Sequence, residues 1–148
     1  MIIKFTIPGS PMGKGRPKFA RRGKFTATYT PEKTANYETL VKWYFQQAAQ
    51  GQNLKGALKA DIFAYFPITK TDAKKKNLFS KMISGIIRPT KKPDWDNIGK
   101  IVCDALNKMA YDDDSSIVDG RVRKYYSDQP KVEVTISEIV NFPEVEDA

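Results

Sequence analysis

Histidine is absent from this sequence of 148 residues, and the only cysteine is Cys103. Catalysis by a Ser–His or Cys–His pair is therefore excluded, and so is any metal site with histidine ligands. A single cysteine forms neither an internal disulfide nor an ordinary structural zinc site, which favours a reduced, cytoplasmic setting. Hydrolytic chemistry in this chain has to rely on carboxylates, lysine, tyrosine or a metal ion bound through oxygen.

Long apolar runs are also lacking. No stretch approaches the ~20 apolar residues of a membrane-spanning helix, and Met1–Phe5 does not begin a signal peptide, so we expect no membrane association. The chain is 41% hydrophobic and 11% aromatic, which is enough for one folded domain over residues 1–148. Residues 143–148 are acidic and are expected to form a frayed tail.

Acidic residues are fewer than basic ones: the sequence has 17 Asp and Glu and 25 Lys and Arg, which gives a net charge of +8. This balance favours a polyanionic partner such as nucleic acid, and a basic but inert surface is the alternative. No acid precedes Glu32, and the basic residues gather in a glycine-bearing segment and in a proline-bearing loop. Side chains of this kind are suited to phosphate contacts. The candidates are Lys14, Arg16, Lys18, Arg21, Arg22, Lys24, Arg88, Lys91 and Lys92.

Alternating and helical patterns predict an α+β domain, with one mixed or antiparallel sheet packed against about three helices. We predict strands over 2–7, 25–30, 58–68, 116–126 and 131–139, and helices over about 31–50, 71–84 and 94–108. The last two strands are separated only by Ser127–Pro130, so they are expected to pair as a hairpin.

Six of the aspartates fall within residues 92–118. Asp94 and Asp96 flank Trp95 where a loop meets the predicted helix, and alternate side chains of an extended segment share one face. Trp95 itself is expected to begin the apolar face of the helix and to contact the core.

Further polar residues follow along this helix. Asn97, Lys100 and Asp104 are three and four residues apart, so they lie on one stripe of the helix. The chain then reverses, which brings Asp113 or Asp114 back toward the helix.

Gathered carboxylates raise one another's pKa unless a cation lies between them, and Mg²⁺ prefers oxygen ligands of this kind. Lys100 would then stabilise negative charge that develops on a phosphate. Spacing alone also allows purely structural roles for these acids. In that case Asp94 or Asp96 caps the helix, Asp104 pairs with Lys100 and Lys108 on the surface, and Asp112–Asp114 form a solvated turn.

Three blocks in this window, KPDWDNIGK (92–100), DALN (104–107) and DDSSIV (113–118), together resemble the RusA family of Holliday junction resolvases. The opening segment IPGSPMGKGRP (7–17) resembles the start of that family as well. D-x-D-N-x-x-K alone is a weak signal, whereas all blocks in this order and spacing are a specific one.

The resemblance implies a small homodimeric, Mg²⁺-dependent endonuclease, often encoded by prophages, that resolves four-way DNA junctions by paired symmetric nicks. Mn²⁺ is a possible substitute, and no organic cofactor is expected. By matching positions, Asp94, Asp96 and Asp114 would bind the metal, Lys100 would be the catalytic lysine, and Asn97 and Asp104 would support them. This chain has three aspartates where the family shows two, so Asp113 is the alternative to Asp114. Asp114 is preferred because Ile117 then falls at the apolar position of the family pattern.

Two other functions compete with this hypothesis. The first is a DNA-binding or recombination accessory protein without catalysis. The second is a metal-dependent nuclease that acts on flaps, forks or RNA instead of four-way junctions.

Overall fold

The computed structural model describes residues 1–16, 18–23 and 25–140. Lys24 and the expected tail at 143–148 lie outside the described residues. The elements are, in chain order, β1 (Ile2–Pro8), β2 (Lys18–Arg22), β3 (Phe25–Tyr29), α1 (Glu32–Ala49), β4 (Leu58–Pro67), α2 (Lys70–Ala73), α3 (Lys76–Ile83), α4 (Trp95–Ala105), the 3-10 turn η1 (Asp114–Ser116), β5 (Ile117–Ser127) and β6 (Lys131–Glu138).

The central feature is a four-stranded mixed sheet with the order β1-β6-β4-β5. β6 is antiparallel to both β1 and β4, and β4 is parallel to β5. This confirms the α+β class and the mixed sheet. The described chain contains four α-helices instead of about three, because two short helices, α2 and α3, replace the single one expected over 71–84.

The hairpin predicted for the last two strands is wrong, because β4 lies between β5 and β6. Every second residue of β4 is buried, whereas no residue of β5 is fully buried. The more buried strand, β4, therefore takes the inner position, with a paired strand on each side. The link from Ser127 to Lys131 spans up to about 15 Å in four Cα steps. That is enough to pass one strand, which needs two spacings of about 4.8 Å.

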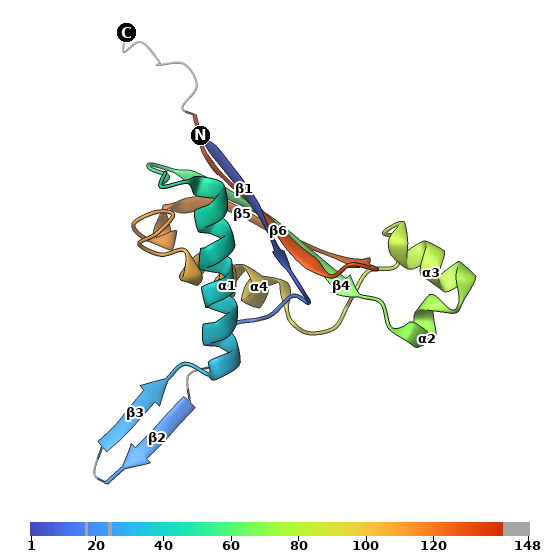
Figure 1. The fold of residues 1–148 in the computed structure, drawn as a ribbon, viewed down its shortest axis with the longest axis horizontal. Coiled ribbons are helices and arrows are strands. Elements are labelled where there is room, and N and C mark those ends of the chain that lie inside the picture. Colours follow the sequence, from blue (N-terminus) through green and yellow to red (C-terminus); the bar gives the residue numbers. More distant parts are fainter. Residues whose placement is uncertain (17, 24, 141–148) are drawn as a thin grey trace.

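The structure also differs from the sequence prediction at residues 18–22. These residues were expected to be part of a flexible basic segment, and they form β2, which pairs with β3 in an antiparallel ribbon. Gly23, in the turn after β2, has a φ of 61°, which glycine adopts without strain. Figure 1 shows this ribbon extending away from the body of the protein near the start of α1.

One face of the sheet carries the core. Side chains of β1, β4 and β6 alternate between buried and accessible, and α1 and α4 pack against the buried face and against each other (Figure 1). α1 contributes Tyr37, Val41 and Phe45 at the three- and four-residue spacing of one helical stripe. Phe5 and Phe45 meet edge to face at 5.7 Å, which joins β1 to α1. This packing fixes α4, the helix that carries the acidic residues.

α4 packs on the sheet through Ile98, Ile101 and Val102, which are fully buried. The prediction that Trp95 contacts the core is wrong, since 61% of this residue is exposed. Trp95 is the first residue of α4, and it lies beside the edge strand β5, where no further strand covers it. None of the helices in the described residues is both long and apolar enough to span a bilayer.

Candidate active site

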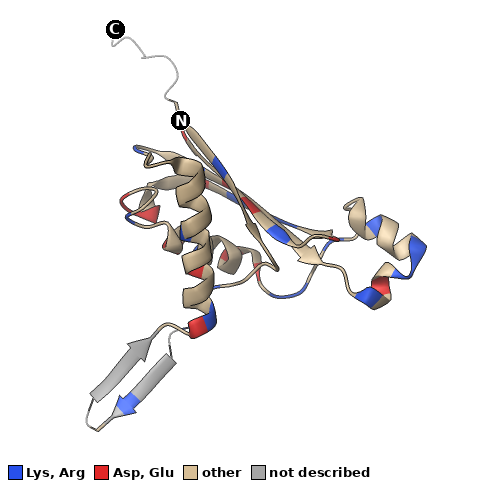
Figure 2. Ribbon diagram, viewed as in Figure 1, with Lys and Arg blue, Asp and Glu red and all other residues tan. Residues whose placement is uncertain are grey.

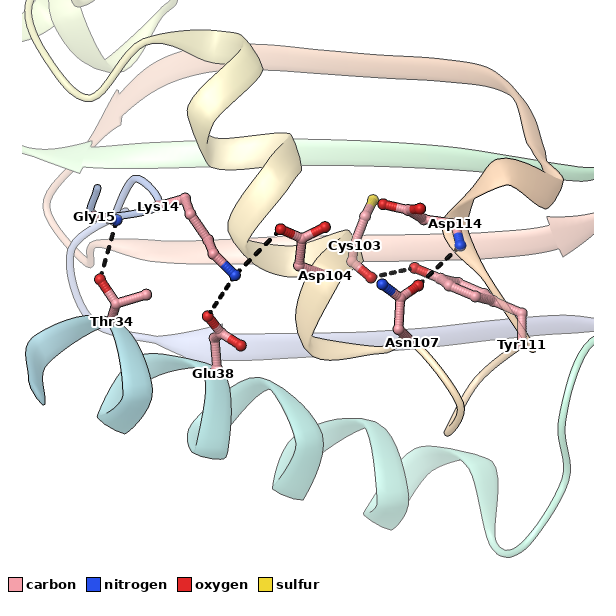
Figure 3. Close-up of polar contacts among 9 residues, drawn as sticks. All are labelled: Lys14, Gly15, Thr34, Glu38, Cys103, Asp104, Asn107, Tyr111 and Asp114. Atoms are coloured by element: carbon pink, nitrogen blue, oxygen red, sulfur yellow. Dashed lines mark hydrogen bonds and ion pairs between the residues drawn. The ribbon is translucent and has the colours of Figure 1, made fainter. Parts of the chain in front are cut away.

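The segment before β2 passes between α1 and α4. The N–H of Lys14 donates to the carbonyl of Asn97 at 3.3 Å, and the N–H of Gly15 donates to Thr34 Oγ1 at 3.0 Å (Figure 3). A Cβ atom on Gly15 would lie 2.5 Å from that same oxygen, so only glycine fits this close approach. The Gly-Lys-Gly sequence thereby anchors the N-terminal segment beside the acidic helix.

Lys14 joins the two helices through its ammonium group. Its Nζ lies 3.0 Å from Glu38 Oε1 on α1 and 3.2 Å from Asp104 Oδ2 on α4 (Figure 3). Burial alone lowers the pKa of Lys14, but the hydrogen bonds and charges of Glu38 and Asp104 outweigh it and raise the pKa above its usual value. In this structure the ammonium group of Lys14 contacts two carboxylates and helps to hold Asp104 in place, while its phosphate contact stays a prediction.

The start of α4 leaves its aspartates available. Asp94 occupies the N-cap position with φ −69° and ψ 154°, yet its side chain makes no capping hydrogen bond. Asp96 follows in the first helical turn, and both residues are exposed. Capping therefore does not account for Asp94, although carboxylates here are favoured by the positive end of the helix dipole.

A surface ion-pair ladder does not account for Asp104 either. Its partner is Lys14, and among the described ion pairs there is none between Asp104 and Lys100 or Lys108. Lys108 has a φ of 62° and lies beyond the end of α4, so it is off the helical stripe on which it was expected.

Seven of the predicted residues line one cleft of about 490 Å³. Its walls are Lys14, Gly15 and Arg16 from the N-terminal segment and Asp94, Asp96, Asn97, Lys100 and Asp104 from α4 and its N-cap. A second hollow of about 620 Å³ shares several of these residues and extends to Lys92 and Pro93. Carboxylates and cations thus line the same cleft, a combination suited to a phosphate held together with a metal ion.

In the turn after α4, Asp113 and Asp114 have different surroundings. Asp113 accepts a hydrogen bond from the N–H of Ser115 at 3.1 Å, caps η1 and is exposed; the hydrogen bonds of Ser115 lower its pKa. Asp114 points toward Cys103 and Asp104 (Figure 3). Burial, and after it the carboxyl group of Asp104, raise the pKa of Asp114. This geometry favours Asp114 over Asp113 as the third acid, in line with the preference drawn from the position of Ile117.

The turn is held by residues that the sequence prediction did not assign to the site. Asn107 Oδ1 accepts the N–H of Asp114 at 2.8 Å, and the hydroxyl of Tyr111 donates to the carbonyl of Cys103 at 2.7 Å (Figure 3). Asn107 closes the DALN block, so the motif contained a signal for it, and Tyr111 follows at a fixed distance.

Asp114 does not line the cleft itself but adjoins it through Asp104. Across residues 1–16, 18–23 and 25–140, no three acidic or thiol groups converge into a preformed metal site. The donor set still fits Mg²⁺, because this ion is commonly bound by one or two carboxylates, water and substrate phosphate oxygens. Asp94 and Asp96 supply two carboxylates with the required oxygen chemistry.

The loop between α3 and α4, in which Lys and Arg are blue in Figure 2, contacts strand β5 through its basic residues. The guanidinium of Arg88 lies 4.1 Å from the Tyr125 ring, and its Nε donates to the carbonyl of Lys124 at 2.8 Å. Lys124 Nζ in turn donates to the carbonyl of Lys91 at 2.6 Å. Burial lowers the pKa of Lys124, while the charge of nearby Asp94 opposes the shift. Lys124 thus connects the loop to β5 beside the cleft, and no motif marked it.

The other residues that were predicted to contact DNA lie either at the groove or on the β2–β3 ribbon. Arg16 and Lys92 are exposed and line the groove, and Arg21 is exposed on the β2–β3 ribbon. The side chains of Lys18 and Arg22, on the same ribbon, lie outside the described residues, as does Lys24. These contacts remain predictions.

Comparison with known proteins agrees with this geometry. The sequence profile described as "Endodeoxyribonuclease RusA" matches residues 8–137, which include the N-terminal segment, α4 and the acidic turn. The chain is also 38% identical over 137 residues to the "Uncharacterized protein YqaN" of Bacillus subtilis (strain 168), covering 93% of this chain and 96% of that protein. The resemblance carried by the three acidic blocks is confirmed, and the chain belongs to the RusA family of endodeoxyribonucleases.

Proposed function

We propose that this protein is a Mg²⁺-dependent endonuclease that resolves Holliday junctions through paired nicks. The observation that carries the proposal is the cleft lined by Asp94, Asp96, Lys100 and Arg16. The family implies a nuclease that acts on branched DNA. Helix capping and a surface ion-pair ladder, which would have made the acids structural, do not describe Asp94 and Asp104.

Asp94 and Asp96 would hold the metal, with Mn²⁺ as an alternative to Mg²⁺. The pKa of Asp114 is raised by burial and, after it, by the carboxyl group of Asp104, and Asp114 would complete the site through Asp104 when a cation offsets the repulsion between these two acids. When bound, the metal would supply a water molecule of lowered pKa and stabilise charge on the phosphate. The sequence has no histidine to act as a general base, so the carboxylates would have to take this role.

The cations of the groove would act on the DNA directly. Arg16 and Lys92 would attract and orient the phosphates of the strand that is cut. Lys100 is exposed on the wall of the cleft, one helical turn beyond Asp96, where it would stabilise the negative charge of the phosphorane transition state.

Junction resolution needs two symmetric nicks, and a four-way junction has approximate two-fold symmetry. We therefore propose a homodimer with one site in each subunit, since a two-fold dimer repeats the same site in matching orientation.

A synthetic four-way junction tests the function. Wild-type protein is expected to make paired nicks with Mg²⁺ and none with EDTA. Asp94→Asn should bind the junction as tightly as the wild type or more tightly, and should not cleave it. Asp128→Asn, in the exposed turn before β6, is the matched control and should cleave normally. Cleavage by Asp94→Asn at the wild-type rate would refute the proposal.

Two further outcomes identify the competing functions. Binding with no nick under any divalent cation would indicate an accessory protein. Faster cleavage of forks, flaps or RNA than of the junction would indicate a different nuclease.

A further inference from the structure

A further hollow lies beside the cleft, and it has a different chemical character. It is an apolar slot of about 220 Å³ between the start of α4 and the edge strand β5, and Trp95, Gly99, Gly120 and Val122 contribute to its walls. Asp96 lines both this slot and the cleft, so the two are contiguous.

The large apolar ring of Trp95 is exposed to solvent. It is 61% exposed, although it starts a helix whose other apolar residues are largely buried. Burying an aromatic ring of this size is strongly favourable, so a ligand that covers Trp95 would gain affinity from the contact. Trp95 is the sequence neighbour of Asp94 and Asp96, the residues proposed to hold the metal at the scissile phosphate.

Two glycines, Gly99 and Gly120, line the slot. A Cβ atom on Gly120 would meet only Ile117 Cγ2 at 3.9 Å, an ordinary contact, and Gly120 has no left-handed φ. Neither space nor backbone conformation therefore requires glycine at 120. On α4, a Cβ at Gly99 would approach Val122 Cγ2 to 3.3 Å, so this residue keeps the helix close to β5.

We propose that this slot binds a nucleobase of the strand whose phosphate is held at Asp94 and Asp96, with the base stacked on Trp95. The inference rests on the proposed function and names a subsite next to it. A nucleotide carries its base and its phosphate on one sugar, which matches an apolar slot and a carboxylate site that share Asp96. Arg121 also lines the slot and is a cation suited to the adjoining phosphate.

A second copy of the chain is a poorer occupant. A protein partner seated on Trp95 would also cover Asp96, because the same slot is lined by both residues, and the DNA would then be excluded from the acids. A nucleobase brings its own phosphate to that place.

The slot also distinguishes branched from linear DNA. A base in a continuous duplex enters a protein pocket only after it is unpaired and unstacked, whereas bases at a branch point are already partly released. Stacking on Trp95 therefore adds affinity for a junction and little for a duplex, and it makes the site sensitive to the base beside the cut.

Binding measured with Ca²⁺ in place of Mg²⁺, a cation that also takes oxygen ligands, separates this step from cleavage. Trp95→Ala should weaken binding of a four-way junction roughly tenfold, in line with the loss of one base–aromatic stack, and leave binding of a linear duplex unchanged. Trp95→Phe should restore most of the loss. Gly120→Leu should fill the slot and weaken junction binding although Trp95 is still present.

Trp43, which is 52% exposed on α1, provides the matched control, because Trp43→Ala should alter neither affinity. In a Trp43→Phe background, junction DNA should quench the fluorescence of Trp95, now the only tryptophan. Equal binding of the junction by wild type, Trp95→Ala and Gly120→Leu would overturn the inference. So would quenching that follows protein concentration instead of DNA, since that would indicate a second copy.

These results are distinguishable from failure of the proposed function. A wild-type protein that binds the junction with a Trp95-dependent preference but never cleaves it would refute the nuclease and support the slot. Normal cleavage with no role for Trp95 would do the reverse.

Discussion

Asn107 Oδ1 accepts the backbone N–H of Asp114 at 2.8 Å, so an uncharged side chain at the end of α4 fixes the acid of the following turn. The hydroxyl of Tyr111 adds a second tie to the carbonyl of Cys103 at 2.7 Å. The distance between Asp114 and the acids of α4 is therefore set by hydrogen bonds that involve none of the carboxylates.

Replacing Asn107 with alanine should lower cleavage of a four-way junction without weakening binding. The N–H of Asp114 loses its partner, the acidic turn shifts, and a displacement of about 1 Å at a catalytic group costs up to roughly 100-fold in rate. Single-turnover cleavage with Mg²⁺ and equilibrium binding with Ca²⁺ measure the two effects. Asn77→Ala, on the exposed surface of α3, is the control. An equal fall in affinity and rate would contradict a positioning role.

Lys14→Met should destabilise the fold by roughly 1–2 kcal/mol, a value between those of exposed and of buried ion pairs. The side chains of Lys14, Glu38 and Asp104 are only 24%, 17% and 23% exposed, so the two carboxylates that remain would repel each other in poorly solvated surroundings. Urea unfolding measures the change. Glu38→Gln introduced into the Lys14→Met protein should recover part of the loss, and Lys42→Met on exposed α1 surface should cost little. An unaltered unfolding midpoint in Lys14→Met would show that the bridge is not structural.

Cys103 should be slow to alkylate. Burial raises the pKa of its thiol to about 11, above the range of a free cysteine, so the thiolate that reacts is scarce at pH 8. Iodoacetamide modification of the native protein should be much slower at pH 8 than modification in urea, and its rate should climb only as the pH approaches 11. Fast native modification at pH 8 would show that the thiol is exposed or activated.

Local pattern was sufficient to locate most of the elements, because alternation and three- to four-residue spacing each depend on a few neighbouring side chains. It placed β1, β4, β6, α1 and α4 close to their observed bounds. It failed for the pairing of β5, since β5 and β6 are close in sequence and the deciding factor is the burial of β4, a strand far earlier in the chain. β2 was missed, although its partner β3 was predicted over 25–30, because the pairing of the two segments leaves no signal within β2 itself.

The same contrast between local pattern and long-range contact applies to the candidate site. Asp94, Asp96, Asn97 and Lys100 come from one short stretch, so helical spacing and the family blocks were enough to bring them together. The bridge from Lys14 to Asp104 joins residues 90 positions apart, and the contact of Lys124 with Lys91 joins residues 33 apart. Such contacts follow from tertiary packing and leave no local signature. Sequence pattern therefore predicted a phosphate contact for Lys14 and gave no sign of its ion pair with Asp104.

Tyr37→Phe should leave the protein more stable. The residue is 5% exposed on the buried side of α1, and its hydroxyl is the one buried side-chain polar atom in the described residues without a hydrogen-bond partner. Burial also raises the pKa of Tyr37, which keeps the hydroxyl neutral. An unpaired buried hydroxyl costs about 1 kcal/mol or more, so its removal should raise the free energy of unfolding by about that amount in a urea titration. Tyr111→Phe removes a hydroxyl that does donate, at 2.7 Å to the carbonyl of Cys103, and should shift the free energy of unfolding in the opposite direction. Destabilisation by both variants would mean that Tyr37 has a partner, such as a buried water molecule, in solution.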